Sequence, residues 1–231
     1  MRNLLALITG LLISALCLAQ SNGPEGITIP LDNPEKLEMV NVQGEAVEHK
    51  GKQGLRLMAA DMSAQEELET LAIIPDVLFG DGIIELEVTG EPAAGAFPQA
   101  RGFVGLAFRL NETDEEYSYE CFYLRPTNGR AKIQAMRNHS IQYVSHPEFP
   151  WYRLRKESPE MYESYTDLVP GEWTKIRIEI SGETGKLYVN DAPQPNLVVN
   201  DLKHGKTKGA VALWIHSSTK AHFRNLKIQP K

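Results

Sequence analysis

The chain has 231 residues, of which 42% are hydrophobic and 23% are charged, so it can bury an ordinary core. This composition excludes a disordered tail and a disulfide-dependent miniprotein. The formal net charge of -6 leaves no basic surplus to neutralise phosphates, and we expect no nucleic acid partner.

The first residues have the features of a secretory signal peptide. A positive charge at Arg2 precedes an almost wholly apolar run over residues 4–18, and Ala19 is a small residue suited to cleavage. The run is shorter than the roughly 20 apolar residues of a spanning helix. We therefore predict a signal peptide over residues 1–19 and a secreted or periplasmic chain without stable membrane insertion, with a retained anchor as the alternative.

Cysteine usage excludes a disulfide framework. Cys17 lies in the signal-like segment, which leaves Cys121 alone in the mature chain. A single thiol forms no internal disulfide, so stability must come from the core. The strand-like neighbours of Cys121 predict a packed, inert thiol rather than a nucleophile.

Short strand-like runs separated by turns fill the rest of the chain. Residues 20–36 show no periodicity and are interpreted as a linker or loose first segment before one domain over residues 37–231. Ser63 and Glu66 have capping-box spacing and predict a helical turn near residues 63–69. Strands are predicted over residues 37–41, 55–58, 70–74, 83–88, 103–110, 117–125, 173–180, 186–190, 209–216 and 221–228.

No helical pattern persists for three turns, and many short strands without intervening helices favour an antiparallel sandwich or barrel. Two of the strands also carry unusual outward faces. Residues 103–110 alternate large apolar side chains with Gly, Ala and then Arg109, and residues 209–216 alternate them with Ala and then Trp214 and His216. Small residues beside large ones would form a shallow floor with raised walls. This pattern predicts a ligand groove, with packing beneath a covering loop as the alternative.

Turn and strand motifs together carry a family resemblance. They occupy residues 79–85 (FGDGIIE), 102–109 (GFVGLAFR), 171–173 (GEW), 186–191 (KLYVND), 209–213 (GAVAL) and 223–228 (FRNLKI). Over about residues 70–228 the chain resembles the concanavalin A-like lectin/glucanase superfamily, and within it laminin-G-like domains and the 3-keto-disaccharide hydrolase domain group. The resemblance implies an all-β, two-sheet antiparallel jelly-roll sandwich with little helix, whose concave face often meets carbohydrate.

Carboxylate pairs are the first candidates for catalysis, because glycoside hydrolysis usually needs two of them about 5–9.5 Å apart. Residues 112–116 match a Glu-x-Asp-x-Glu signature by letter, but their polar surroundings predict a solvated loop. Glu120 lies in a strand where it alternates with Phe122 and Leu124 toward the core. It must find a cation or a donor there, and it is either catalytic or a structural buried carboxylate.

Arginine and aromatic residues gather on the opposite face of that strand and after it. Residues 145–161 show no clear strand and predict a long, irregular, functional loop. Aromatic rings and guanidinium groups would recognise a sugar or clamp an acidic one, whereas arginines paired with nearby glutamates are the alternative. The predicted ligand-binding residues are Arg109, Tyr119, Tyr123, Arg125, Arg137, Trp151, Arg153, Trp214 and His216.

Histidines complete the candidate chemistry. His139, His146 and His216 join Glu120 as candidate acid–base groups, because histidine titrates near neutrality. Their spacing is not that of a zinc site, although His216 and His222 flank a turn and could converge with a carboxylate. No cofactor is predicted. Calcium occurs in the superfamily, but no Asp-rich loop indicates it here.

The sequence thus predicts a secreted carbohydrate-interacting sandwich that binds a glycan on its concave face. One alternative is a glycoside hydrolase of the 3-keto-disaccharide hydrolase type, acting on a disaccharide or keto-glycoside. A further alternative is a laminin-G-like protein-binding module.

Overall fold

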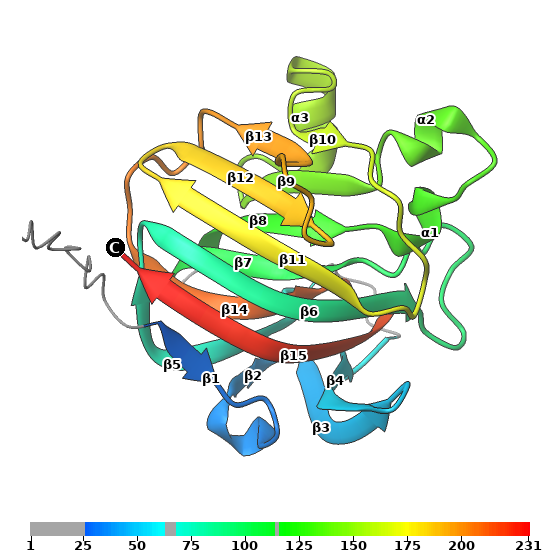
Figure 1. Ribbon diagram of the computed structural model, residues 1–231, viewed down its shortest axis with the longest axis vertical. Coiled ribbons are helices and arrows are strands. Elements are labelled where there is room, and N and C mark those ends of the chain that lie inside the picture. The colour runs from blue at the N-terminus through cyan, green and yellow to red at the C-terminus, as the bar shows by residue number, and fades with distance from the viewer. Residues whose placement is uncertain (1–25, 63–67, 114–115) are drawn as a thin grey trace, which may run out of the picture.

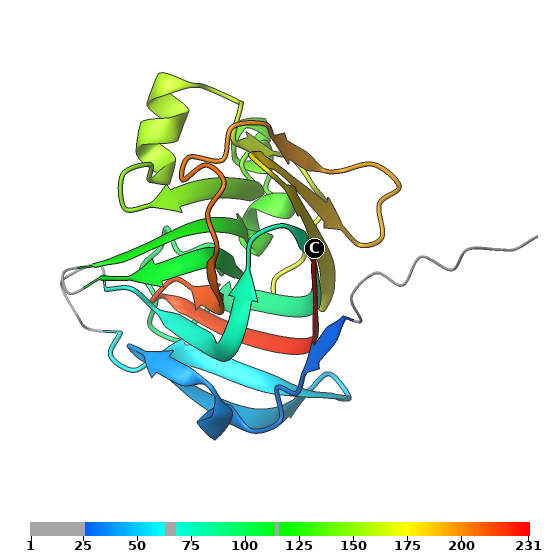
Figure 2. The same ribbon diagram turned by 90° about the vertical axis from the view of Figure 1, so that its left-hand side faces the viewer.

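The computed structural model describes residues 26–62, 68–113 and 116–231. Its strands form two antiparallel sheets packed face to face, and the helices of the described ranges are short (Figures 1 and 2). This architecture confirms the predicted all-β sandwich with little helix. The predicted signal peptide and residues 63–67 of the predicted helical turn lie outside the described residues. Within those ranges, no helix has the length and apolar character needed to cross a membrane.

The eight-stranded sheet lies in front in Figure 1. A three-residue strand, β1 (Ile27–Ile29), pairs with β15 (Thr219–Pro230), so the expected loose segment forms a strand at residues 27–29, and its residues 20–25 lie outside the described ranges. The 3-10 helix η1 (Pro34–Lys36) follows, capped by Asn33. The order of the remaining strands is β13 (Leu197–Val199), β12 (Thr184–Val189), β11 (Thr174–Ser181), β6 (Gly82–Pro92), β15 (Thr219–Pro230), β4 (Lys52–Ala59) and β3 (Val42–His49).

The seven-stranded sheet lies behind and carries the helices at one end. Its order is β10 (Glu163–Ser164), β9 (Ile141–His146), β8 (Tyr117–Leu124), β7 (Val104–Glu112), β14 (Gly209–Ile215), β5 (Leu71–Phe79) and β2 (Glu38–Val40). The helices α1 (Pro126–Gly129) and α2 (Gln134–Arg137) connect β8 to β9, and α3 (Trp151–Glu157) follows β9. The predicted irregular loop over residues 145–161 is therefore wrong where α3 forms.

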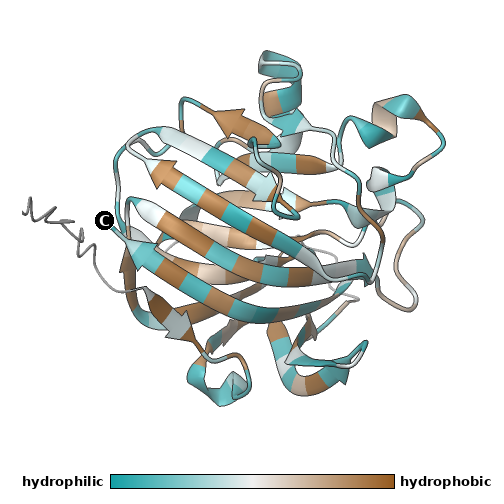
Figure 3. Cartoon of the chain, in the orientation of Figure 1, coloured by the Kyte–Doolittle hydropathy of each residue, from teal (hydrophilic) through white to brown (hydrophobic). Residues whose placement is uncertain are grey.

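The core lies between the two sheets, because every second side chain of a strand points toward the opposite sheet. In β11, Ile176 and Ile178 are buried, whereas Lys175 and Arg177 face outward. Figure 3 shows the same alternation of apolar and polar residues along β6, β11 and β15. The inner faces of both sheets thereby form one continuous hydrophobic core.

A β-bulge in β7 redirects Arg109. The pairing of β7 with β8 shifts register between Phe108 and Asn111, and Arg109 has a positive φ of 53°. The alternation that carries Ala107 to the outer face ends there, and the Arg109 side chain is fully buried. The prediction that Arg109 faces a ligand groove is wrong, because the bulge breaks the period of two on which that prediction rests.

The buried guanidinium of Arg109 instead ties three turns together. It donates hydrogen bonds to the backbone oxygens of Gly80 and Gly182, over 3.1 and 2.7 Å, and to that of Gly205. Asp81 supplies the counter-charge at 3.0 Å. Because a buried charge is costly unless it is paired and hydrogen-bonded, these contacts fix how the three turns meet.

Arg109→Met is expected to lower the free energy of unfolding by about 3 kcal/mol or more, because the buried carbonyl oxygens and Asp81 lose their donor. Urea unfolding measures the loss as a lower midpoint. Arg177→Met is the matched control, since Arg177 is partly exposed beside Glu179 and its loss should cost less than about 1 kcal/mol. Equal effects of the two substitutions would contradict the role given to Arg109.

Candidate functional site

A cavity of about 580 Å³ opens on the outer face of the seven-stranded sheet. Tyr119 and Tyr123 of β8 and Trp214 of β14 lie along it, whereas the alternating residues Phe122 and Leu213 point into the core between the sheets. The cavity thus occupies the face on which the alternation of small and large residues predicts a groove. Loops on either side of the sheet and α3 form its walls.

The floor is built from small residues with aromatic rings beside them. Gly105 pairs with Tyr123 on one side and with Trp214 on the other. A Cβ at Gly105 would come within 2.2 Å of the Phe122 carbonyl oxygen and 2.6 Å of the Tyr123 Cβ. Because position 105 has no side chain, the rings of Tyr123 and Trp214 lie across it with centroids 4.9 Å apart. The half-buried ring of Trp214 gives the floor an apolar, aromatic surface, and Tyr123, which is 3% exposed, packs beneath it.

Cys121 lies on the same face of the sheet, and its thiol is unreactive. It packs among the apolar residues of this face and is fully buried. Burial raises the pKa of its thiol well above the usual range, and Glu69 adds to the effect. A thiol that stays protonated is a poor nucleophile, which agrees with the prediction of a packed, inert cysteine.

One end of the cavity holds what we call the Glu69 pole, made of Glu69, Tyr119 and His146. The His146 Nδ1 lies 3.3 Å from a carboxylate oxygen of Glu69, and the Tyr119 hydroxyl donates to the other oxygen. The rings of Tyr119 and His146 stack with centroids 5.0 Å apart, and Trp214 donates to the Tyr119 hydroxyl over 3.2 Å. Burial, with Glu69 nearby, raises the pKa of Tyr119 well above its usual value.

Glu69 is a residue of the cavity that the sequence did not predict. It lies just before β5, at the end of an acidic stretch with no recognisable spacing to any other candidate residue. Its partners Tyr119 and His146 come from strands far along the chain, so their convergence depends on the pairing of β8 with β9. No local pattern signals that arrangement.

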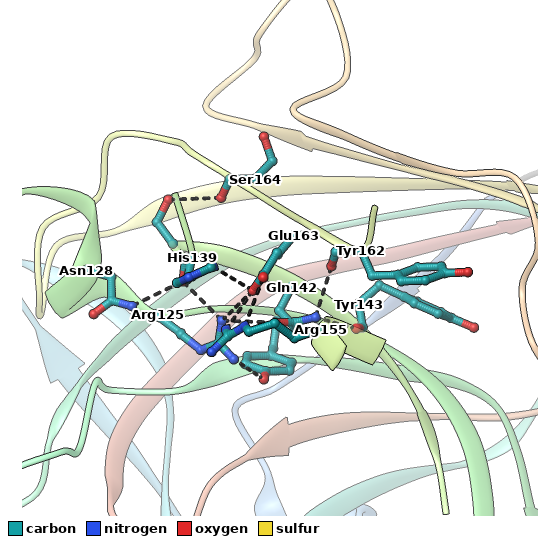
Figure 4. A network of polar contacts seen from close by, with 11 residues as sticks. Arg125, Asn128, His139, Gln142, Tyr143, Arg155, Tyr162, Glu163 and Ser164 are labelled. Atoms are coloured by element: carbon teal, nitrogen blue, oxygen red, sulfur yellow. Dashed lines mark hydrogen bonds and ion pairs between the residues drawn. The ribbon is translucent and has the colours of Figure 1, made fainter. Parts of the chain in front are cut away.

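The wall near the helices is organised by a buried carboxylate, Glu163, with a side chain 4% exposed (Figure 4). Arg155 donates two hydrogen bonds to it, over 2.9 and 2.7 Å. The His139 Nδ1 lies 2.8 Å from the same carboxylate, and an Arg125 nitrogen lies 3.7 Å from it. One carboxylate thus gathers two guanidinium groups and an imidazole.

Arg125 extends this network to the floor. It donates to the Tyr123 hydroxyl over 2.8 Å, and to the Gln142 side chain and the His139 carbonyl oxygen over 3.1 Å each. Burial raises the pKa of Tyr123 to about 12, against the opposing effect of Arg125. Burial lowers the pKa of His139, and the guanidinium groups of Arg155 and Arg125 act in the same direction. Tyr123 therefore stays neutral, and protonation of His139 is disfavoured.

The rim combines aromatic rings with another arginine. His216 lies against Phe103 and Phe97, with ring centroids 5.0 and 5.8 Å apart. Trp151 of α3 is exposed and lies under the guanidinium of Arg155 at 4.8 Å.

Arg101 donates from one nitrogen, Nη1, to the carbonyl oxygens of Pro98 and Ala100, over 2.9 Å each.

The structure brings most of the predicted site residues to this cavity. Those that line it are Tyr119, Tyr123, Arg125, His139, His146, Trp151, Trp214 and His216. Arg137 does not line it, because its guanidinium lies over Tyr165 and donates to that hydroxyl over 2.7 Å.

Arg153 also lies outside the cavity. The prediction that it binds ligand assumed an irregular loop over residues 145–161. In α3, residues two apart lie on different sides of the helix. Arg153 accordingly pairs with Glu157 over 2.9 Å and stacks on Phe149, whereas Arg155 reaches Glu163.

Glu120 faces the core, as the alternation predicted, but it does not reach the cavity. It is fully buried, accepts from the Tyr143 hydroxyl, and accepts from the backbone N–H of His204 over 2.8 Å. Burial and the neighbouring carboxylate raise the pKa of Tyr143 well above its usual value. The candidate catalytic role of Glu120 is therefore wrong, and the residue is a structural carboxylate between the sheets.

Metal ligands do not gather in the described ranges, where no group of three or more His, Cys, Asp or Glu side chains could hold an ion. The suggested convergence of His216 and His222 does not occur. His222 instead stacks on His49, with centroids 4.0 Å apart, and burial lowers its pKa to about 4. His216 contacts Ser218 and lines the cavity.

Comparison with known proteins identifies the family. The model of the 3-keto-alpha-glucoside-1,2-lyase-like domain matches residues 41–229. The chain belongs to this family. This agrees with the resemblance to the 3-keto-disaccharide hydrolase group seen in the sequence. No curated protein matches the chain.

Solved structures share the fold at low identity. A Bacillus subtilis protein of unknown function with a galectin-like fold aligns at TM-score 0.57 and 14% identity, over 88% of this chain and 94% of that chain. The Ca²⁺-bound exoplasmic/lumenal domain of VIP36 aligns at 0.50 and 11%, over 89% and 90%. Carbohydrate binding module CBM66 from Bacillus subtilis aligns at 0.49 and 14%, over 83% and 97%. The first two likenesses establish the fold alone.

Glu163→Gln is expected to lower the pKa of His139 further below its usual value, because Glu163 raises that pKa whereas Arg155 and Arg125 lower it. Loss of the buried counter-charge should also lower the free energy of unfolding by about 3 kcal/mol. Titration of the His139 imidazole by NMR measures the first effect, and urea unfolding the second.

Glu157→Gln is the control for this substitution, since Glu157 pairs with Arg153 outside the cavity. It should leave both quantities nearly unchanged. A pKa of His139 that rises or stays constant in Glu163→Gln would contradict the organisation described for this wall.

Proposed function

We propose that the outer-face cavity binds a saccharide, and the aromatic floor is the observation that carries this proposal. Sugar rings have apolar C–H faces and hydroxyl rims. The half-buried ring of Trp214, packed against Tyr123, suits the first, and the polar side chains of the two walls suit the second. The volume of about 580 Å³ lies within the roughly 300–1,000 Å³ of small-molecule sites.

A saccharide fits this surface better than a protein partner does. The cavity is concave and combines a few apolar rings with convergent hydrogen-bonding groups, whereas protein interfaces bury broader patches. This favours a small ligand over the laminin-G-like alternative. We also propose that the chain works outside the cytoplasm, on the basis of the charged start and apolar run at its N-terminus.

Trp214→Ala is expected to weaken saccharide binding at least tenfold, because it removes the half-buried aromatic ring of the floor. Isothermal titration against a panel of α-linked disaccharides and their 3-keto derivatives measures the dissociation constants. Circular dichroism establishes that the variant is folded.

Tyr165→Ala is the matched control, since Tyr165 is a partly exposed aromatic residue that contacts Arg137 away from the cavity. It should bind as the unsubstituted protein does. If no saccharide of the panel binds the unsubstituted protein, the proposed function fails.

The family description and the Glu69 pole favour a second candidate function, elimination across C1 and C2 of a 3-keto-glucoside. The ketone at C3 acidifies the proton on C2. A base removes that proton, the electron pair forms the C1=C2 bond, the C1–O bond breaks, and the departing oxygen takes up a proton. His146 suits the base, because an Nδ1–H directed at Glu69 leaves the Nε2 lone pair for the substrate.

His146→Gln is expected to lower kcat for a 3-keto-α-glucoside at least 100-fold, because the base is lost. Glu69→Gln should lower kcat less, since the imidazole remains but its tautomer is no longer fixed. Aglycone release and the ultraviolet absorption of the unsaturated ketone follow the reaction. His204→Gln is the control, since His204 lies outside the cavity, and full activity of His146→Gln would exclude this assignment.

A further inference from the structure

The two ends of the cavity differ in charge and are well separated. We call the end opposite the Glu69 pole the guanidinium pole, made of Arg101, Arg125, Arg155 and Glu163. Tyr119 belongs to the Glu69 pole, and Tyr123 contacts Arg125 at the other. These tyrosines are four residues apart on β8, and at about 3.3 Å per residue their Cα atoms lie about 13 Å apart. A ligand that reaches both poles has more than one sugar ring.

The guanidinium pole carries a surplus of positive charge. It has three guanidinium groups and one carboxylate, and Arg125 and Arg155 share that carboxylate. The whole chain has a net charge of -6, so this surplus is a local feature and not a property of the surface at large. A cluster of this kind attracts an anionic group.

Arg101 is the arginine of this pole whose Nε–Nη2 edge has no partner among the described residues. Its Nη1 donates to two backbone oxygens, whereas Nε and Nη2 have no hydrogen-bond partner among the described residues. No carboxylate of the described ranges forms an ion pair with it. The unused edge of a guanidinium matches the two oxygens of a carboxylate.

Asn128 adds an unsatisfied acceptor beside this arginine. The residue is 5% exposed, lines the cavity, and donates from Nδ2 to the His139 carbonyl oxygen over 3.2 Å. Its Oδ1 is buried and has no partner in the described part of the chain. The backbone N–H of Thr127 donates to the Arg101 carbonyl oxygen over 3.2 Å, so the backbone of Arg101 runs beside the segment that carries Asn128. A buried acceptor of this kind needs a donor such as a ligand hydroxyl.

We infer that the guanidinium pole recognises an anionic saccharide, with Arg101 pairing its negative group and the Asn128 Oδ1 accepting a neighbouring hydroxyl. The inference rests on the proposed saccharide binding and adds the class of ligand. A uronic or aldonic acid carboxylate and a sugar phosphate share this chemistry. The carboxylate matches the planar edge of Arg101 more closely.

Isothermal titration with matched pairs tests the inference: maltose against maltobionate, methyl α-glucoside against methyl α-glucuronide, and trehalose against trehalose 6-phosphate. We expect at least one carboxylate-bearing ligand to bind tenfold or more tightly than its neutral partner. That preference should fall as salt rises from 50 to about 500 mM. A preference confined to the phosphate pair would assign the pole to sugar phosphates and overturn the carboxylate assignment.

Arg101→Gln should abolish the preference, because the carboxylate-bearing ligand then loses its guanidinium partner. Asn128→Ala should weaken both members of a pair. Arg153→Gln is the matched control, because it removes an arginine of α3 that faces away from the cavity, and it should keep the preference.

The outcomes separate this inference from the proposed function. Equal binding of neutral and anionic ligands, or an unchanged preference in Arg101→Gln, would overturn the inference and leave saccharide binding intact. Absence of binding by every ligand, neutral and anionic, would overturn both.

Discussion

One buried carboxylate holds the wall of the cavity together. Glu163 is 4% exposed, and a carboxylate so far from water is stable only when cations and donors surround it. Arg125, His139 and Arg155 meet that requirement from three separate segments. The segments of His139 and Arg155 have little core of their own, since α2 buries no residue and α3 buries only Leu154. Polar geometry, more than apolar packing, therefore determines the shape of this wall.

The arrangement of side chains on the floor depends instead on the pleat of the sheet. This arrangement could be predicted from the sequence. Alternation along β7 and β14 is local information, so it assigns Trp214 and the small residues around Gly105 to one face of the sheet. The same alternation along β8 separates Tyr123, which faces the cavity, from Glu120, which faces the core. The two-sheet architecture and the family follow from patterns of the same kind.

The rest depends on contacts between distant segments, which a local pattern does not encode. Arg109 leaves the cavity face because of a β-bulge in β7. Its guanidinium is then held by turns that lie far apart in the sequence. Arg153 and Arg155 diverge because their segment is a helix and not an irregular loop. Glu69 belongs to the site only because strand pairing brings His146 and Tyr119 to it.

The unequal charge of the two ends has a consequence for how a ligand lies on the floor. A carboxylate at the Glu69 pole repels an anionic group, whereas the arginines of the opposite pole attract it. If the proposed anionic saccharide binds, this charge difference favours one direction, and that direction would present its uncharged ring to His146. An uncharged saccharide lacks this bias, and a share of its bound population would lie reversed. Binding energy gained far from the reacting bond would in this way orient the reacting ring, which is how remote contacts contribute to rate and not only to affinity.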